Sequence, residues 1–366
     1  MGDHPTLPDY AGACISNVVP ALLEPTDAPT PWIPSAALEA DQVVLLVLDG
    51  LGWEQLESRR HLAPALSAMT GGPISSVVPS TTATALTSIA TGLTPGEHGV
   101  VGYRLAVDGE VLNVLRWSTP SGDARRHIDP DTFQPCRAFC GQRPPIVTKA
   151  EFIRSGFSGA HLSEVRFNGY RMTSTLVTEL RRQLRAGEPF VYGYYDGVDK
   201  VAHEYGLGEF YDAELVAADR LVADILGVLP AGAALLVTAD HGQVDVGDAL
   251  VSLHPEVGIH VSYQSGEGRF RWLHARPGRT AALHAAAVAH HGDQAWVRTV
   301  DETVDEGWWG ATITATARAR LGDVALVACD DISFSDPLDT GPFALIGRHG
   351  SLTPAEMWVP LLAGPT

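Results

Sequence analysis

The chain has 366 residues, 45% of them apolar and 19% charged, and its formal net charge is −18. This composition is typical of a globular protein with a sizeable core, and it excludes a disordered or fibrous chain. An acidic surface repels nucleic-acid backbones and anionic membranes, so we expect no nucleic-acid polymer among the partners. The four cysteines are too few for a disulfide framework.

The N-terminal residues lack the basic stretch and apolar run of a secretory signal. No apolar run in the chain reaches the ~18 residues of a membrane span. We therefore expect a cytoplasmic protein without a membrane span. The sequence does not indicate an oligomeric state.

Continuous apolar runs predict the strands of a buried sheet. After a proline-rich leading segment with one short helix at 14–23, such a run covers residues 43–52. Similar runs lie at 190–195, directly before Asp240, and directly before His349. Runs that are apolar on both faces are typical of central strands covered by helices.

Helical stretches lie between these runs, at residues 82–91, 173–186 and 214–229. Alternation of strands and helices predicts an α/β fold with a doubly wound, mostly parallel sheet flanked by helices.

Two segments interrupt the alternation. Residues 106–145 begin with a glycine-turned hairpin and are predicted to be an insertion. Residues 251–340 contain a strand, an Ala/His-rich helix at 280–290 and a second strand, which predicts a small α+β cap with a βαβ-like unit. The catalytic core is then expected to comprise residues 1–250 and 341–366.

Acidic and histidine side chains follow the predicted strands. Because the carboxyl ends of strands are where open α/β sheets bind ligands, we expect these side chains to meet. Carboxylates and imidazoles together suit Zn²⁺, with Mn²⁺ as the second choice. Any one of them alone is more often a turn residue or an ordinary histidine. The candidate ligands are Asp49, Asp199, His203, Asp240, His241 and His349.

A run of hydroxyl residues precedes the predicted helix at 82–91. Ser80 or Thr81 could cap this helix, and most such clusters are caps. A hydroxyl in the first turn would also face an anion held by the free N–H groups of the helix. A threonine becomes a nucleophile only beside a base or a metal, which the Asp/His group would provide.

Taken together, the motifs of the chain resemble those of the alkaline phosphatase superfamily. The segments LVLDGLG, PSTTATALTSIATGLTPGEHGVVGY, DGVDKVAHEYG, TADHGQ and GRHGS occur in that family's order and approximate spacing, most like its type I phosphodiesterase/nucleotide pyrophosphatase branch. The resemblance covers 42–250 and 341 to the C-terminus, and it is weak in the predicted cap. It implies an alkaline phosphatase-like fold and two-metal hydrolysis of a small phosphate ester through a phospho-threonine.

The resemblance also implies roles for individual residues. The nucleophile lies nine residues before Thr91 and is therefore Thr82, which would lie between the two metal ions and bind them; a register error of one or two residues would select Thr81 or Ser80. One ion would be held by Asp199, His203 and His349. The other would be held by Asp49, Asp240 and His241.

The chain departs from the branch at one position that matters. Three residues after the nucleophile the branch commonly has an Asn that contacts a phosphoryl oxygen, whereas this chain has Ala85. We expect a backbone N–H or the side chain of Tyr205 to replace it. Neither Arg104 nor Arg348 has a spacing that aims it at phosphorus, so we expect diesters to react faster than monoesters.

Other readings stay open at this stage. A phosphomonoesterase or phosphonate hydrolase would share the same ligands, and a phosphomutase would need a long second domain that is not visible. A non-catalytic binding protein would have lost ligands or nucleophile. For the conspicuous His98 and the pair Trp308-Trp309 a structural role is the more common one, and Lys200 is more often solvated than bound to phosphate.

Overall fold

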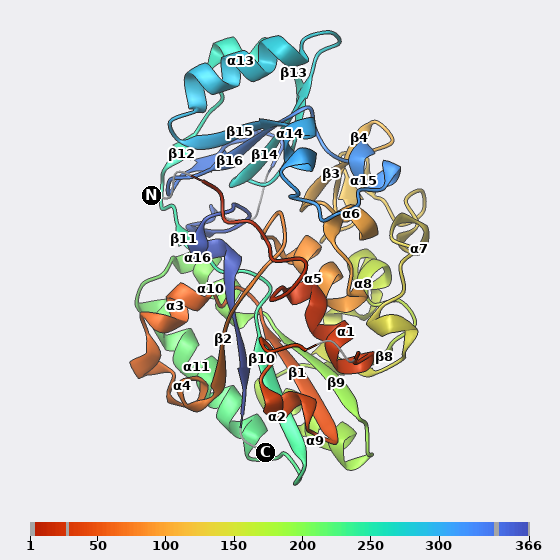
Figure 1. Cartoon of the computed structure of the whole chain (residues 1–366). Coiled ribbons are helices and arrows are strands. Elements are labelled where there is room, and N and C mark those ends of the chain that lie inside the picture. The colour runs from red at the N-terminus through yellow and green to blue at the C-terminus, as the bar shows by residue number, and fades with distance from the viewer. Residues whose placement is uncertain (1–3, 27–28, 340–343, 365–366) are drawn as a thin grey trace.

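A seven-stranded sheet forms the centre of the molecule, in a computed structural model that describes residues 4–26, 29–339 and 344–364 (Figure 1). Adjacent strands are parallel except where β19 takes part, which runs antiparallel to both neighbours. In spatial order the strands are β2 (Thr70–Ser75), β19 (Trp358–Ala363), β10 (Ala233–Thr238), β1 (Gln42–Leu48), β9 (Phe190–Tyr195), β7 (Pro145–Lys149) and β8 (Arg166–Tyr170).

The three central strands β10, β1 and β9 are buried along almost their whole length, as their continuous apolar runs predict. Helix α9 (Thr173–Arg185) packs on β7, β8 and β9, and α2 (Ser35–Leu38) packs on β10. The predicted doubly wound, mostly parallel α/β fold is therefore confirmed. None of the helices in the described part of the chain combines the length and apolarity needed to cross a membrane.

The predicted helices form close to their expected positions. Helix α5 covers Thr82–Thr91, α9 covers Thr173–Arg185, and α1 covers Val18–Leu23 behind a short 3-10 turn. Helix α11 (Glu209–Leu226) begins and ends earlier than the sequence pattern indicates.

The prediction of a main-sheet strand before His349 is wrong. In this segment only Gly347–Arg348 is extended, as β18, and it pairs with β11 (Val244–Asp245) outside the main sheet; residues 340–343 lie outside the described residues. The sheet instead takes β19, whose six residues are apolar throughout. The segment before His349 carries Arg348, whose charge disfavours burial between two layers.

The predicted insertion begins as a β-hairpin of β3 (Arg104–Val107) and β4 (Glu110–Asn113), which short strands at 118–119 and 122–123 extend to four strands. Asp108 and Gly109 form its turn with φ values of +49° and +85°. A two-residue turn with both φ positive matches the right-handed twist of the strands, which explains the Asp-Gly sequence.

A second, antiparallel sheet lies at the other end of the molecule from the main sheet (Figure 1). It consists of β13 (Val261–Gly266), β14 (Phe270–Ala275), β16 (Val324–Ala328) and β15 (Ala295–Thr299). Helix α13 (Thr280–His291) joins β14 to β15, which run in the same direction on either side of β16. The predicted βαβ-like unit is thus split by an intervening strand. The boundaries of the cap at 251 and 340 stay a prediction.

The two faces of this sheet have different partners. One face and α13 form a separate apolar cluster that includes Leu273, Leu283 and Val297. On the other face Phe270 and Trp272 pack against Trp308 and Trp309, which are fully buried in the main core. Trp308 and Trp309 therefore have a structural role in the hydrophobic core.

A buried ion pair fixes the turn before β14 to the end of the main sheet. Arg269 donates to both carboxylate oxygens of Glu356, at 3.0 and 2.7 Å, and also to the carbonyl of Ile332 at 2.8 Å. Glu356 lies in α16 (Pro354–Met357), directly before β19, and both side chains are fully buried. The geometry is that of a bidentate, charge-assisted pair.

Replacing Arg269 by Met is expected to lower the free energy of unfolding by about 3–5 kcal/mol, because Glu356 would remain as a buried carboxylate without its partner. Urea unfolding followed by fluorescence measures this change. Arg276→Met, at an exposed position after β14, is the matched control and should change it by less than about 0.5 kcal/mol. Equal effects of the two substitutions would contradict the prediction.

Candidate active site

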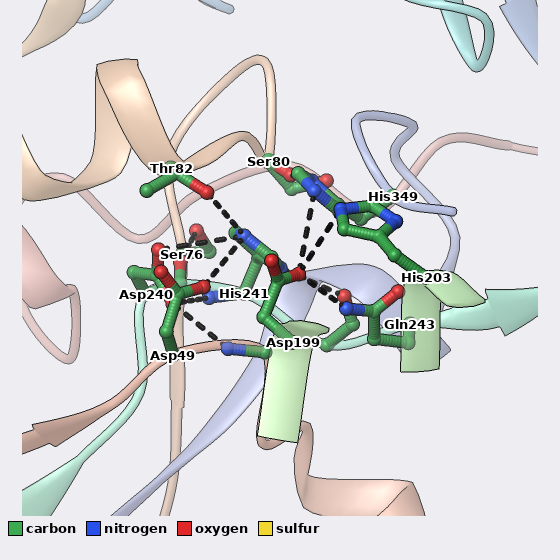
Figure 2. A network of polar contacts seen from close by, with 12 residues as sticks. Asp49, Ser76, Ser80, Thr82, Asp199, His203, Asp240, His241, Gln243 and His349 are labelled. Carbon is green, nitrogen blue, oxygen red and sulfur yellow. Dashed lines mark hydrogen bonds and ion pairs between the residues drawn. The ribbon is translucent and has the colours of Figure 1, made fainter. Parts of the chain in front are cut away.

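The six predicted Asp/His residues come together at the carboxyl ends of three adjacent strands (Figure 2). Asp49 follows β1, and Asp240 and His241 follow β10. Asp199 and His203 lie one turn apart on α10 (Gly197–Tyr205), which begins directly after β9. His349 comes from the segment behind β18. The fold therefore brings together side chains that are up to 300 residues apart in the chain.

The first group consists of Asp49, Asp240 and His241, all buried. His241 Nε2 lies 3.4 Å from Asp49 Oδ1 and 3.4 Å from Asp240 Oδ2. Among the described residues neither of these two carboxylate oxygens has a hydrogen-bond partner. Buried polar atoms are almost always paired, so two unpaired oxygens facing one imidazole are suited to ligating a cation.

The second group consists of Asp199, His203 and His349. Asp199 Oδ1 lies 3.3 Å from His203 Nε2 and 3.7 Å from His349 Nε2. The ring of His349 stacks on that of His241 at 3.5 Å, so the two groups adjoin. Ligand atoms of Asp199, His241 and His349 also lie within 4.8 Å of one another, which places His241 at the boundary of both groups.

Each imidazole in the site is oriented by a backbone carbonyl. The Nδ1 atoms of His203, His241 and His349 lie 2.7, 3.0 and 2.9 Å from the carbonyl oxygens of Gly347, Gly242 and Ser80. A carbonyl only accepts, so Nδ1 must carry the proton in each ring. The Nε2 atoms then face the carboxylates, as metal-ligating histidines require.

Electrostatics in the site favour a bound cation. Burial raises the pKa of Asp49 well above its usual value, and the neighbouring carboxylates of Asp240 and Asp199 raise it further. Burial lowers the pKa of His349 well below its usual value, with His241 and His203 adding to the effect. The histidine is therefore neutral at neutral pH, whereas the crowded carboxylates lack a compensating positive charge.

Two sets of these residues bring their ligand atoms close enough to hold a divalent ion: Asp49, Asp240 and His241, and Asp199, His241 and His349. His203 approaches the second set through Asp199. Ligand atoms at about 2.0–2.1 Å from Zn²⁺ in a tetrahedron lie about 3.3 Å from one another. The separations of 3.3, 3.4 and 3.7 Å between Nε2 and carboxylate oxygens are close to that value.

Thr82 is the first residue of α5, and its hydroxyl faces the first group (Figure 2). Its Oγ1 lies 3.1 Å from His241 Nε2. Ser80 instead donates its hydroxyl to the carbonyl of Ser351 at 2.6 Å, and Thr81 precedes the helix as its N-cap. Within the described ranges, Thr82 is the only serine or threonine whose hydroxyl contacts a side chain of the six.

Ala85 is fully buried, and its N–H already bonds to the carbonyl of Thr81. The preceding N–H groups of the first turn have no acceptor within the helix. These groups are therefore the available backbone donors beside Thr82.

Two cavities meet at Thr82, Leu115 and Asp199. The inner cavity, of about 220 Å³, is walled mainly by apolar and aromatic side chains such as Leu86 and Tyr192. The outer cavity, of about 470 Å³, extends toward the second sheet, and its charged or polar lining residues include Tyr103, Arg116, Glu267, Asp339 and Arg348.

Several residues of the site are not indicated by the sequence motifs. Tyr194 donates its hydroxyl to Asp49, and Gln243 donates its amide to Asp199 Oδ1 at 2.6 Å. Asp196, at the end of β9, pairs with Lys149 at 2.6 Å and with Lys200 at 2.8 Å. Gln243 directly follows the Asp-His-Gly step, which is a signal that could have revealed it.

Three other predicted assignments have clear positions. Tyr205 lies at the exposed end of α10, where its ring stacks on Phe210 at 4.4 Å, and it lines neither of the two cavities. His98 is buried against Ser88 at 2.8 Å, and burial lowers its pKa to about 3, which fits the structural role. Lys200 is ion-paired and lines the inner cavity.

Comparisons with known proteins place this site in a family. A family model described as type I phosphodiesterase/nucleotide pyrophosphatase matches residues 43–352. No curated protein matches the chain by sequence.

Solved structures share the fold. An inactive variant of murine ectonucleotide pyrophosphatase/phosphodiesterase 5 in complex with AMP superposes with a TM-score of 0.66 at 15% identity, covering 89% of this chain and 88% of that one. Phosphonoacetate hydrolase from Sinorhizobium meliloti in complex with phosphonoacetate gives 0.63 at 18% identity, covering 89% and 91%. The resemblance seen in the sequence is confirmed, and because the family model spans most of the chain, the chain belongs to the type I phosphodiesterase/nucleotide pyrophosphatase family and is a phosphoric ester hydrolase.

Proposed function

We propose that the chain is a two-metal phosphodiesterase or nucleotide pyrophosphatase that uses Thr82 as nucleophile and forms a phospho-threonine. The observation that carries this proposal is the 3.1 Å contact of Thr82 Oγ1 with a histidine whose neighbouring carboxylate oxygens are orphaned. Asp49, Asp240 and His241 would hold one ion, and Asp199, His203 and His349 the other. Zn²⁺ suits these ligands best, and Mn²⁺ is the second choice.

Two such ions would supply Lewis acidity at the phosphoryl oxygens and at the attacking and leaving oxygens. Their charge exceeds that of the three carboxylates by one. An anionic substrate is therefore attracted locally although the protein as a whole is strongly acidic.

The chain's own residues prepare Thr82 for attack. His241 carries its proton on Nδ1, so its Nε2 lone pair would ligate the ion, and the 3.1 Å approach of Thr82 Oγ1 to this atom would place the hydroxyl oxygen beside the same ion. As the oxygen attacks phosphorus, Thr82 loses its proton to solvent and the bond to the leaving oxygen breaks. Water then attacks the phospho-threonine, the bond from phosphorus to Thr82 Oγ1 breaks, and this oxygen takes up a proton to restore the hydroxyl.

The first turn of α5 supports the phosphoryl group. Its free N–H groups and the positive end of the helix dipole face the oxygens that gain charge during attack. They would take the role of the Asn that the sequence resemblance led us to expect at the position of Ala85.

The two cavities favour a substrate with two substituents on phosphorus. The inner cavity offers apolar contacts to one ester group, while a monoester would leave it unused. Arg104, one of the two nearby arginines, is paired to Asp336 at 2.6 Å and is not available for a phosphate dianion.

We therefore expect kcat/KM for bis(4-nitrophenyl) phosphate to exceed that for 4-nitrophenyl phosphate. Steady-state rates of metal-replete enzyme on both compounds give the ratio. A ratio below one would reverse the ranking and favour a phosphomonoesterase.

A phosphonate hydrolase is the second candidate, favoured by the structural likeness to phosphonoacetate hydrolase and by Lys200 in the inner cavity. Lys200 and Lys149 both pair with the carboxylate of Asp196, and Lys200 would be the cation that meets a substrate carboxylate in this cavity. Release of phosphate from phosphonoacetate faster than hydrolysis of the diester would select this function.

A further inference from the structure

Arg348 lies in the outer cavity beside the candidate metal ligand His349. Its Nε donates to the carbonyl of Leu345 at 3.3 Å. Its Nη1 lies against Gly268, in the turn between β13 and β14, where an added Cβ would come within 2.9 Å of it. The guanidinium is thus held across the cavity, from β18 toward the second sheet.

The acidic residues around Arg348 either pair with other arginines or are largely protonated. Asp336 pairs with Arg104 at 2.6 Å, and Asp339 lies 3.4 Å from Arg271. Burial raises the pKa of Glu267 to about 8, so this carboxyl is largely protonated at neutral pH.

Within residues 4–26, 29–339 and 344–364, no carboxylate lies within ion-pair distance of Arg348. The neighbouring segment 340–343 has the sequence TGPF and contains no acid. The carboxylates of the described residues therefore form no ion pair with this half-buried guanidinium, although the charge of Asp339 acts on it. A half-buried charge without a partner is costly, and a planar guanidinium binds oxyanions bidentately.

We infer that Arg348 binds an oxyanion of the substrate other than the scissile phosphoryl group, a second phosphoryl group or a carboxylate carried by one ester arm. This inference rests on the proposed function, and it makes Arg348 a specificity-determining residue of that reaction. The preferred substrate is then asymmetric, with an uncharged or aromatic arm in the inner cavity and an anionic arm in the outer one.

The contacts of Arg348 favour a partner other than the scissile phosphoryl group. That atom must lie at Thr82 Oγ1, against Asp49, Asp240 and His241. Arg348 has no polar contact with any of these residues, and its guanidinium is directed at Gly268. It is therefore placed for a group farther along the substrate.

The test uses three 4-nitrophenyl phosphodiesters whose second arm is phenyl, 4-carboxyphenyl or 4-phosphonophenyl. Their kcat/KM values are measured with wild type, Arg348→Gln and Arg348→Lys. For Arg348→Gln we expect losses of about 10- to 100-fold on one or both charged arms and less than about threefold on the phenyl arm. Whichever charged arm shows the larger loss identifies the oxyanion.

Arg220→Gln is the matched control, since Arg220 is an exposed arginine of α11 outside both cavities. It removes the same charge and should leave all three rates within twofold. If Arg348→Gln does not fold, Arg348→Lys decides, with a selective loss of about three- to tenfold expected because the bidentate geometry is removed.

Equal losses on charged and uncharged arms would show that Arg348 acts only by positioning His349, and no loss would show that it does not contact substrate. Either result overturns the inference while leaving the hydrolase intact. Failure of the wild type to hydrolyse any of the three diesters would instead refute the proposed function.

Discussion

Replacing Thr82 by Ala is expected to lower kcat on bis(4-nitrophenyl) phosphate by about 10³- to 10⁵-fold. A nucleophile acts as one unit with the groups that activate it, so its deletion removes nearly all of their joint effect. Thr82 also has the hydroxyl that touches the Asp/His group, whereas the Ser80 hydroxyl is bonded to a carbonyl. Steady-state rates of purified variants measure the loss, and acid-quenched enzyme analysed by mass spectrometry should carry the phosphoryl adduct on Thr82.

Alanine variants of the two preceding residues are the controls for this assignment. Thr81→Ala and Ser80→Ala should retain activity within about tenfold, because neither hydroxyl contacts the six Asp/His side chains. Thr82→Ser keeps a hydroxyl and should retain more activity than Thr82→Ala. A large loss in Thr81→Ala together with a mild effect in Thr82→Ala would shift the nucleophile by one residue.

The central sheet and the cluster of ligands could be predicted because both depend on local signals. Continuous apolar runs predict β1, β9 and β10, and an Asp or His behind each run predicts where ligands meet, since parallel strands end at one edge. Asp199 and His203 were predictable for the same reason, because a spacing of four places both on one helical face.

The surroundings of the cluster could not be predicted, because they depend on contacts between distant segments. Arg348 reaches the outer cavity only because β18 pairs with β11 and the turn at Gly268 docks against it. Tyr194 looks like any aromatic of a buried strand until the fold brings its hydroxyl to Asp49. The wrong prediction of a main-sheet strand before His349 also arises from a contact between distant segments, since the apolar run alone did not show that Arg348 must face a cavity.

Removal of divalent metal is expected to abolish turnover, lowering kcat at least about 100-fold, and to lower the melting temperature. The three carboxylates lie close together with two orphaned oxygens, so loss of the ions restores their repulsion. Ions that bind only the folded chain add about 2.7 kcal/mol at a free concentration of 100 Kd. Elemental analysis, activity and thermal melting are compared before and after dialysis against a chelator, with Zn²⁺ or Mn²⁺ added back.

The dependence of metal binding on pH has a definite sign. Burial and the adjacent carboxylates raise the pKa of Asp49, so a proton competes with the ion for this ligand. Affinity should therefore rise as pH increases through that pKa and fall as pH decreases. His349 contributes little above neutral pH, because burial already keeps its pKa far below the usual value.

Substitution of one carboxylate in the first group tests whether that carboxylate ligates the metal or acts only through the net charge of the protein. Asp240→Asn keeps the size of the side chain but removes an anionic ligand, so we expect the apparent Kd for Zn²⁺ to rise by about 10- to 100-fold. Asp224→Asn removes the same charge from an exposed position on α11 and should leave this Kd unchanged. Equal Kd values for the two variants would mean that the carboxylates do not ligate metal. Full activity in chelator-treated protein with less than one ion per chain would refute the two-metal mechanism itself, and His241 would then have to act on Thr82 as a general base across the same 3.1 Å contact.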